Sequence, residues 1–320
     1  MNYRRLGQAG IKLSEIGLGS WLTYGGGVED DYSRACIRRA FDLGVNFFDT
    51  ADVYHHGKAE EVYGQQLSAF RRQDVVIATK CFFPMSERVN DRGLSRKHIF
   101  ESVEGSLKRL RIDYIDLYQC HRFDPEVEPF ELIRAMDDLI RQGKILYWGA
   151  SEWSALEIKN ICALAREMRA HPPVSNQPEY SIAARQIETN GVQQACVEER
   201  LGMVLWSPLK QGILTGKYSG GKIPADSRAA SEEMNIFLQE VDRDLVDRVD
   251  RLQPIAHRNG MTLAQLVIAW LLSRQAVTSV IIGATKAAQV EENIAATTFK
   301  LTDEDLAGIE ELFPATDFGG

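Results

Sequence analysis

The chain has 320 residues, of which 44 % are hydrophobic and 26 % are charged, a balance that excludes a disordered chain. Its 45 acidic residues outnumber 37 basic ones, and the net charge of -8 argues against a general affinity for nucleic acid or anionic membranes. The five cysteines have no metal-ligand spacing and no apolar run is long enough to cross a bilayer, so we expect a cytoplasmic protein without a metal site.

Short apolar runs alternate with amphipathic stretches along the chain. A predicted hairpin covers residues 3–15. The predicted strands follow at residues 16–18, 45–48, 75–79, 114–118, 145–149, 174–177, 203–206 and 280–282. Runs of this kind, without polar alternation, are typical of parallel strands that are covered on both faces. Between them, Ser154 with Glu157 and Thr262 with Gln265 have the capping-box spacing that begins a helix.

About eight strands that alternate with helices predict an α/β protein. Because no Pro/Gly/Ser-rich linker divides the chain, we expect one domain over residues 1–320. A single closed (β/α)₈ barrel, or TIM barrel, with an N-terminal hairpin fits this pattern better than two doubly wound halves. The polar interval 218–235 predicts a long loop after the seventh strand, and a loop of this length usually has a function such as that of a lid.

Four polar residues follow predicted strands, at the end of the barrel where active sites form: Asp49, Tyr54, Lys80 and His121. Taken singly, each is at least as well explained by a structural or solvated role. Together they predict a proton-transfer site, because a buried lysine needs a carboxylate partner and its charge lowers the pKa of a neighbouring phenol.

The glycines after the first strand read GLGSW and YGGG rather than GxGxxG, which argues against a Rossmann dehydrogenase. Phosphate could instead be bound by backbone N–H groups in residues 207–216 and at the helix that follows GATK. Lys217, Arg228 and Lys286 would add positive charge there, although each could equally be a solvated surface residue.

The chain resembles the aldo-keto reductases, in particular the branch that includes the voltage-gated potassium channel β subunits and their bacterial relatives. The motifs that carry the resemblance include NFFDTADVY, SLKRLRIDYIDLYQCHRFD, WSPLKQGILTGKY and GATKAAQVEEN, in this order along nearly the whole chain. The resemblance implies an NADPH-dependent carbonyl reductase on a (β/α)₈ barrel. It also implies that Asp49, Tyr54, Lys80 and His121 are the catalytic tetrad, with Tyr54 as the proton donor.

The same resemblance implies the cofactor contacts, with Trp206 stacked on the nicotinamide and Ser151 and Gln177 bonded to its carboxamide. The other implied cofactor residues are Asp49, Gly19, Ser20 and Trp21 near the ring, Ser207, Pro208, Leu209, Gly212, Leu214 and Lys217 at the pyrophosphate, and Arg228, Gly283, Thr285, Gln289, Glu292 and Asn293 at the adenosine and its 2′-phosphate. Glu152 departs from the family pattern, which often has a neutral or basic residue there. Trp21, Tyr24 and Phe82 would line a pocket for aldehydes with an apolar or aromatic body.

Two other functions are open. One is a regulatory subunit that binds NADP(H) and turns over slowly, and the presence of His121 opposes it because the channel subunits lack this histidine. The other is a barrel aldolase with Lys80 as a Schiff-base lysine, which leaves Trp206 and Arg228 unexplained. We expect a small carbonyl compound as the ligand and no nucleic-acid or membrane partner, and we leave a homo-oligomer open.

Overall fold

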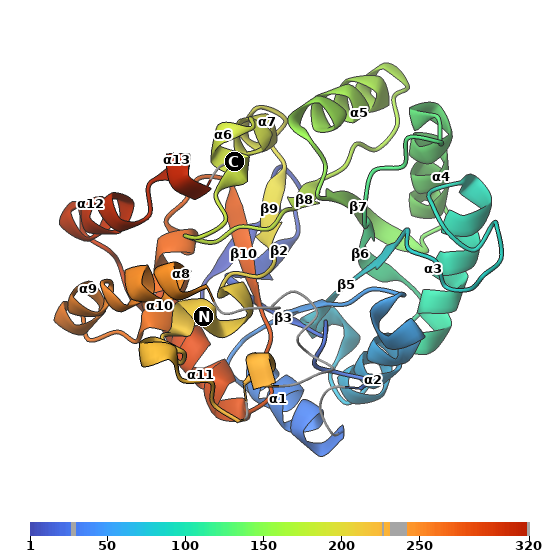
Figure 1. Cartoon of the computed structure of the whole chain (residues 1–320). Coiled ribbons are helices and arrows are strands. Elements are labelled where there is room, and N and C mark those ends of the chain that lie inside the picture. The colour runs from blue at the N-terminus through green and yellow to red at the C-terminus, as the bar shows by residue number, and fades with distance from the viewer. Residues whose placement is uncertain (27–29, 226, 231–241, 319–320) are drawn as a thin grey trace.

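A closed barrel of parallel strands forms the centre of the molecule (Figure 1). The structure is a computed structural model that describes residues 1–26, 30–225, 227–230 and 242–318. Within these residues the barrel strands are β3 (Ile16–Gly19), β4 (Phe47–Asp49), β5 (Val76–Cys81), β6 (Ile115–Cys120), β7 (Ile145–Ser151), β8 (Ser175–Gln177), β9 (Gly202–Leu205) and β10 (Val277–Ile282). Each strand pairs with its neighbour in this order, and β10 pairs with β3 to close the barrel. The predicted (β/α)₈ barrel is confirmed.

The predicted hairpin is also present, as β1 (Tyr3–Arg5) and β2 (Lys12–Ser14) in antiparallel register. Leu6 and Leu13 of this segment are fully buried in one cluster with Phe47, Leu117 and Val204 from the barrel strands. The hairpin therefore covers barrel residues with apolar side chains.

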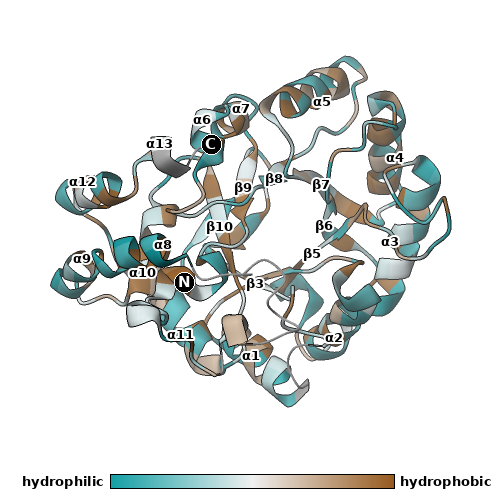
Figure 2. Cartoon of the chain, in the orientation of Figure 1, coloured by the Kyte–Doolittle hydropathy of each residue, from teal (hydrophilic) through white to brown (hydrophobic). Residues whose placement is uncertain are grey.

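Helices surround the barrel and turn their apolar faces toward it (Figure 2). They are α1 (Asp30–Asp42), α2 (Lys58–Leu67), α3 (Arg96–Leu110), α4 (Pro129–Arg141), α5 (Ala155–Glu167), α6 (Gln186–Thr189), α7 (Val192–Glu198), α8 (Arg243–Asp250), α9 (Gln253–Arg258), α10 (Leu263–Leu272), α11 (Ala287–Ala295), α12 (Asp303–Leu312) and α13 (Ala315–Phe318). Both predicted capping boxes form, one before α5 and one before α10. These reciprocal bonds satisfy backbone N–H groups that an uncapped helix would leave without a partner.

The described residues of the segment after β9 form three short 3-10 helices, η3 (Lys210–Thr215), η4 (Ser219–Gly221) and η5 (Arg228–Ala230). Tyr218 anchors this segment, because its ring is fully buried and its hydroxyl accepts a bond from the Ala229 backbone N–H at 3.4 Å. Residue 226 and residues 231–235 of the predicted long loop lie outside the described residues, so its role as a lid stays a prediction.

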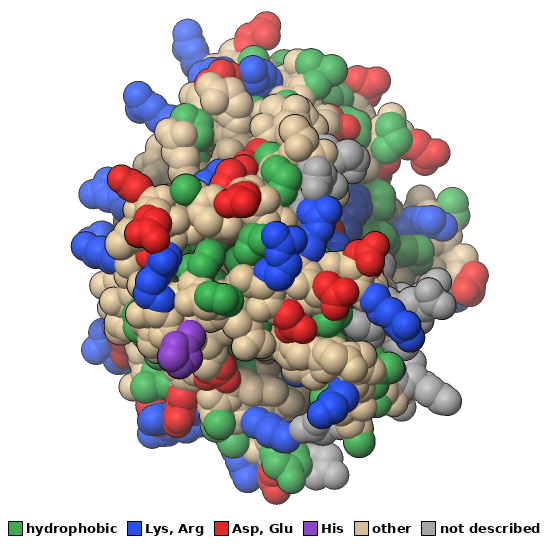
Figure 3. Space-filling model, turned by 60° about the vertical axis from the view of Figure 1, so that its left-hand side comes forward, with side chains coloured by type: hydrophobic (Ala, Val, Ile, Leu, Met, Phe, Trp, Pro, Cys, Tyr) green, Lys and Arg blue, Asp and Glu red, His purple; other side chains and the backbone are tan. Residues whose placement is uncertain are grey.

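The described surface mixes charges of both signs with apolar side chains, as the face in Figure 3 shows. None of the helices in the described residues is long and apolar enough to span a membrane.

Candidate active site

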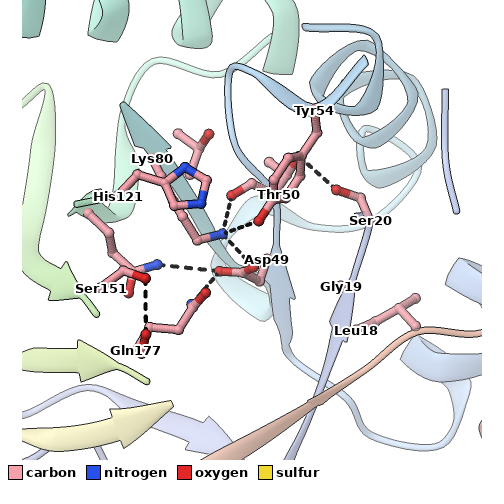
Figure 4. Close-up of polar contacts among 12 residues, drawn as sticks. Leu18, Gly19, Ser20, Asp49, Thr50, Tyr54, Lys80, His121, Ser151 and Gln177 are labelled. Atoms are coloured by element: carbon pink, nitrogen blue, oxygen red, sulfur yellow. Dashed lines mark hydrogen bonds and ion pairs between the residues drawn. The ribbon is translucent and has the colours of Figure 1, made fainter. Parts of the chain in front are cut away.

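A buried ion pair lies at the carboxyl ends of β4 and β5 (Figure 4). The Lys80 ammonium lies 2.7 Å from Oδ2 of Asp49 and donates to the carbonyl oxygen of Thr50, also at 2.7 Å. Lys80 is 0 % exposed, so its charge depends on these partners. Burial lowers the pKa of Lys80, but Asp49 and the Tyr54 hydroxyl raise it, and the net shift is upward. The lysine therefore stays protonated.

Tyr54 completes this arrangement from η1 (Tyr54–Gly57), the turn that follows β4. Its hydroxyl lies 3.4 Å from the Lys80 ammonium. Burial raises the pKa of Tyr54 and the charge of Lys80 lowers it, with a net upward shift. Lys80 thus acts in the predicted direction on the phenol, although desolvation outweighs it.

His121 directly follows β6, and its ring centroid lies 5.7 Å from that of Tyr54, nearly edge to face. Burial and the charges of Lys80 and Arg122 hold the pKa of His121 well below its usual value. The imidazole is therefore neutral near pH 7. Its Nδ1 atom is buried and makes no hydrogen bond to any described residue. The four predicted tetrad residues thus lie together at one end of the barrel (Figure 4).

Two glutamines, one on β6 and one on β8, hydrogen-bond the other oxygen of Asp49. Oδ1 accepts bonds from Nε2 of Gln177 at 2.9 Å and from Nε2 of Gln119 at 3.3 Å. Ser151, at the end of β7, donates to the Gln177 carbonyl oxygen at 3.0 Å. Gln119 was not among the site residues predicted from the sequence. Gln119 precedes His121 by two residues, and alternate side chains of a strand share a face. This spacing could have indicated that both side chains face the same site.

Trp206 follows β9 and is half-buried. Its indole N–H donates to Oε1 of Glu152 at 2.6 Å, and its ring lies edge to face with that of Trp21 at 6.1 Å. The same Glu152 oxygen accepts the backbone N–H of Glu179 at 2.5 Å. Glu152, noted in the sequence only as a departure from the family pattern, therefore fixes the edge of the Trp206 indole.

The segment after Trp206 turns sharply, with positive φ at Ser207, Lys210, Gln211 and Gly212. Such a backbone presents N–H groups to one side and is suited to anions. Gly212 has a φ of 95°, which favours glycine, and the Lys217 ammonium lies 2.5 Å from the position that a Cβ atom would take there. The other predicted pyrophosphate residues Pro208, Leu209 and Leu214 belong to the same turn.

The predicted adenosine residues lie at the end of β10 and along α11. Oε1 of Gln289 accepts bonds from the backbone N–H groups of Thr285 and Lys286 at 2.9 and 3.2 Å, so Gln289 organises the start of this helix. Gly283 precedes them, Glu292 is exposed and Asn293 is buried. Of Arg228, at the start of η5, only the backbone lies within the described part of the chain.

The predicted pocket residues differ in position. Trp21 and Phe82 are half-buried, and Phe83 lies between Phe82 and His121, with ring centroids 5.3 and 4.9 Å away. Tyr24 is instead fully buried, and its hydroxyl donates to the Ala284 carbonyl oxygen at 3.3 Å. It packs in the core and does not line a pocket, because the hydroxyl finds its partner in the backbone there.

The family model described as "Aldo/keto reductase family" matches residues 15–313. The chain belongs to the aldo/keto reductase family. The chain is 43 % identical over 299 residues to a protein of Oryza sativa subsp. japonica named "Probable voltage-gated potassium channel subunit beta", with 92 % of this chain and 91 % of the relative covered. A protein of the same name from Arabidopsis thaliana is 42 % identical with the same coverage. A Schizosaccharomyces pombe protein, likewise named as such a subunit, is 40 % identical over 323 residues, which cover 98 % of this chain and 94 % of the relative. The resemblance found in the sequence is confirmed.

Proposed function

We propose that this aldo/keto reductase reduces aldehydes and ketones to alcohols with NADPH, and that Tyr54 supplies the proton. The observation that carries the proposal is the buried Lys80, which lies between the Asp49 carboxylate and the Tyr54 hydroxyl at the ends of the strands. NADPH, when bound, supplies the hydride that is added to the carbonyl carbon.

The side chains act on the carbonyl oxygen, where negative charge grows during the reaction. The Tyr54 hydroxyl and the neutral His121 ring both hydrogen-bond this oxygen, and Tyr54 gives it the proton. Lys80 stabilises the phenolate left on Tyr54, and Asp49 keeps Lys80 charged and in place. A step of this kind typically accelerates a reaction ~10²–10⁴-fold.

The residues present fit the cofactor. Trp206 offers a half-buried aromatic face, and the turn at Gly212 offers a backbone concavity with Lys217 beside it. Trp206, Ser151 and Gln177 would hold the nicotinamide and its carboxamide. The Gly212 turn would hold the pyrophosphate, and the start of α11 with Arg228 would hold the adenosine phosphate.

A second candidate is a regulatory protein whose cofactor occupancy matters more than its turnover. The names of the relatives favour it, because all three relatives are named as channel subunits. His121 beside Tyr54 favours the enzyme, since it supplies a second donor to a carbonyl oxygen.

The test measures aldehyde-dependent oxidation of NADPH and quenching of tryptophan fluorescence by NADPH. We expect turnover in the native protein and at least a ~100-fold loss in Tyr54→Phe, with NADPH affinity retained. Tyr32→Phe is the matched control, because Tyr32 is 56 % exposed on α1. Quenching without turnover of any aldehyde favours the regulatory protein, and turnover by Tyr54→Phe within tenfold of the native rate refutes the proton-donor role.

A further inference from the structure

Arg122 is a half-buried cation beside the catalytic residues. Its guanidinium donates to the backbone carbonyl of His121 at 2.5 Å and lies 5.4 Å from the centre of the Phe83 ring. Phe83 in turn packs against the His121 ring at 4.9 Å. Burial raises the pKa of Tyr54 and lowers that of His121, and the Arg122 charge pulls both pKa values downward. The positive charge of Arg122 therefore affects both side chains that would bind the carbonyl oxygen of a substrate.

Within the described residues no carboxylate pairs with Arg122. Other half-buried arginines do have such partners, since Arg72 pairs with Asp116 and Arg109 pairs with Glu60, both at 2.6 Å. A partly desolvated cation without a counter-charge is unfavourable, and an anion brought by a ligand would relieve this cost.

The nearest acid in the sequence is engaged elsewhere. Asp124 accepts the backbone N–H of Leu94 at 2.7 Å and that of Glu126 at 3.1 Å. Its two oxygens therefore hold the loop before α3 and their own turn, and they do not pair with Arg122.

The cofactor phosphates are also poor partners for Arg122, because of the strand order. Arg122 follows β6, whereas the predicted phosphate segments follow β9 and β10, and β6 lies across the barrel from β10 in the closed order (Figure 1). An anion near Arg122 therefore comes from the substrate side of the site.

We propose that Arg122 selects carbonyl substrates that carry a carboxylate, with the carboxylate held by the guanidinium and the carbonyl held by Tyr54 and His121. This inference rests on the proposed reductase function. One guanidinium matches the single charge of a carboxylate and can bind it with two parallel bonds. The guanidinium and the His121 ring both pack on the Phe83 ring, so a substrate that reaches both would lie along this ring with its two groups several bonds apart. A flat spacer suits this aromatic surface.

The test compares 4-carboxybenzaldehyde with its neutral isostere 4-formylbenzamide. We expect the native protein to favour the carboxylate in kcat/KM by about 10- to 100-fold, the range for a charge-assisted bidentate contact. Arg122→Met removes the charge and keeps a long apolar stem, and it should bring this ratio close to one. The variant should reduce both aldehydes more slowly, because the Arg122 charge no longer lowers the pKa of Tyr54. This loss is common to both substrates, so it cancels in the ratio of their kcat/KM values.

Arg92→Met is the matched control, because Arg92 is an exposed arginine of the loop between β5 and α3 and its loss changes the net charge equally. It should leave the ratio at the native value. A native ratio near one, or a ratio that Arg122→Met leaves unchanged, overturns the inference while the reductase function stands.

Isothermal titration with the same two compounds gives a readout that needs no turnover. If neither aldehyde is reduced, the proposed function fails, and the inference is then decided by whether the native protein binds the carboxylate more tightly and Arg122→Met does not. Equal affinities in both proteins overturn it.

Discussion

Glu152 accepts the indole N–H of Trp206 and the backbone N–H of Glu179 on one carboxylate oxygen, at 2.6 and 2.5 Å. The backbone of Glu152 is left-handed, with φ of 58°, and its side chain reaches from the end of β7 past the end of β8 to the residue that follows β9. A residue that follows one strand thus fixes an aromatic ring that follows another.

Replacing Glu152 with Ala should free the Trp206 ring and raise the NADPH dissociation constant by roughly 10- to 100-fold, because a charge-assisted bond is worth about 1.5–3 kcal/mol. Glu152→Gln keeps an acceptor oxygen and should stay within about threefold of the native value by the same arithmetic. Fluorescence titration with NADPH measures both. Equal affinities in the native protein and Glu152→Ala would show that the contact does not orient Trp206.

Replacing His121 with Asn should lower kcat about 100-fold and leave NADPH affinity unchanged, because the shorter side chain displaces the donor from the carbonyl oxygen. Since His121 is neutral near pH 7, its ionisation should not appear in kcat between pH 6 and 8. Steady-state kinetics on a reactive aromatic aldehyde checks both statements. An acidic limb in this range that disappears in the variant would contradict the neutral role.

Asp52 should make the fold less stable as the pH rises. Its carboxylate accepts the Val53 backbone N–H at 2.6 Å and the Ser102 hydroxyl at 2.7 Å, and burial and the charge of Glu60 raise its pKa to about 7. A raised carboxyl pKa favours the protonated folded state, so this stabilisation is complete below the ordinary pKa near 4. It is lost as the pH rises through about 7.

Asp52→Asn cannot ionise; its Oδ1 can still accept the Val53 backbone N–H, and its NH₂ group can donate to the Ser102 hydroxyl oxygen in place of accepting from it. It should exceed the native protein in unfolding free energy by about 2–4 kcal/mol at pH 8, with the difference shrinking toward pH 5. Denaturant titrations at several pH values measure it, with the exposed Asp113→Asn as the charge-matched control. A difference that does not change with pH would exclude Asp52 as the titrating group.

Gly64 lets α2 approach the end of α3. A Cβ atom there would contact the Arg109 carbonyl oxygen and would lie 2.7 Å from the Leu110 carbonyl carbon. Gly64→Ala should therefore cost about 1–3 kcal/mol of stability, although alanine is the better helix former. Gly10→Ala is the control, because no atom lies within 4 Å of its added Cβ. Equal melting temperatures for the two variants would mean that the helices separate without cost.

The strands, and the positions of Asp49, Lys80 and His121 at the strand ends, could be predicted because both depend on local sequence. Strands buried on both faces read as apolar runs, and Asp49, Lys80 and His121 sit at or directly after such runs. The observed strand boundaries differ from the predicted ones where pairing between strands sets them. Strand β10 begins at Val277, which pairs with Met203, and not at residue 280.

The missed features depend on contacts between distant segments. The bond from Lys80 to the Thr50 carbonyl uses the backbone, which side-chain patterns do not reveal. The Glu152 contact with Trp206 needs a left-handed residue in one loop and a ring from another. Tyr24 was predicted to line the pocket because it lies close to Trp21 in the sequence. Its hydroxyl instead bonds the Ala284 carbonyl, a contact that depends on how the loop after β3 packs.

The pairing of β10 with β3 also constrains how the chain is made. Ile16 of β3 pairs with Val280 of β10. The first barrel strand to leave the ribosome therefore lacks one of its two pairing partners until the last barrel strand has been made. Until then β3 and β9 both have open edges with unpaired backbone groups, which other chains can pair with. The nascent protein is therefore most prone to aggregate just before β10 emerges, and a stop codon placed shortly before Val277 should yield an insoluble product that chaperones retain.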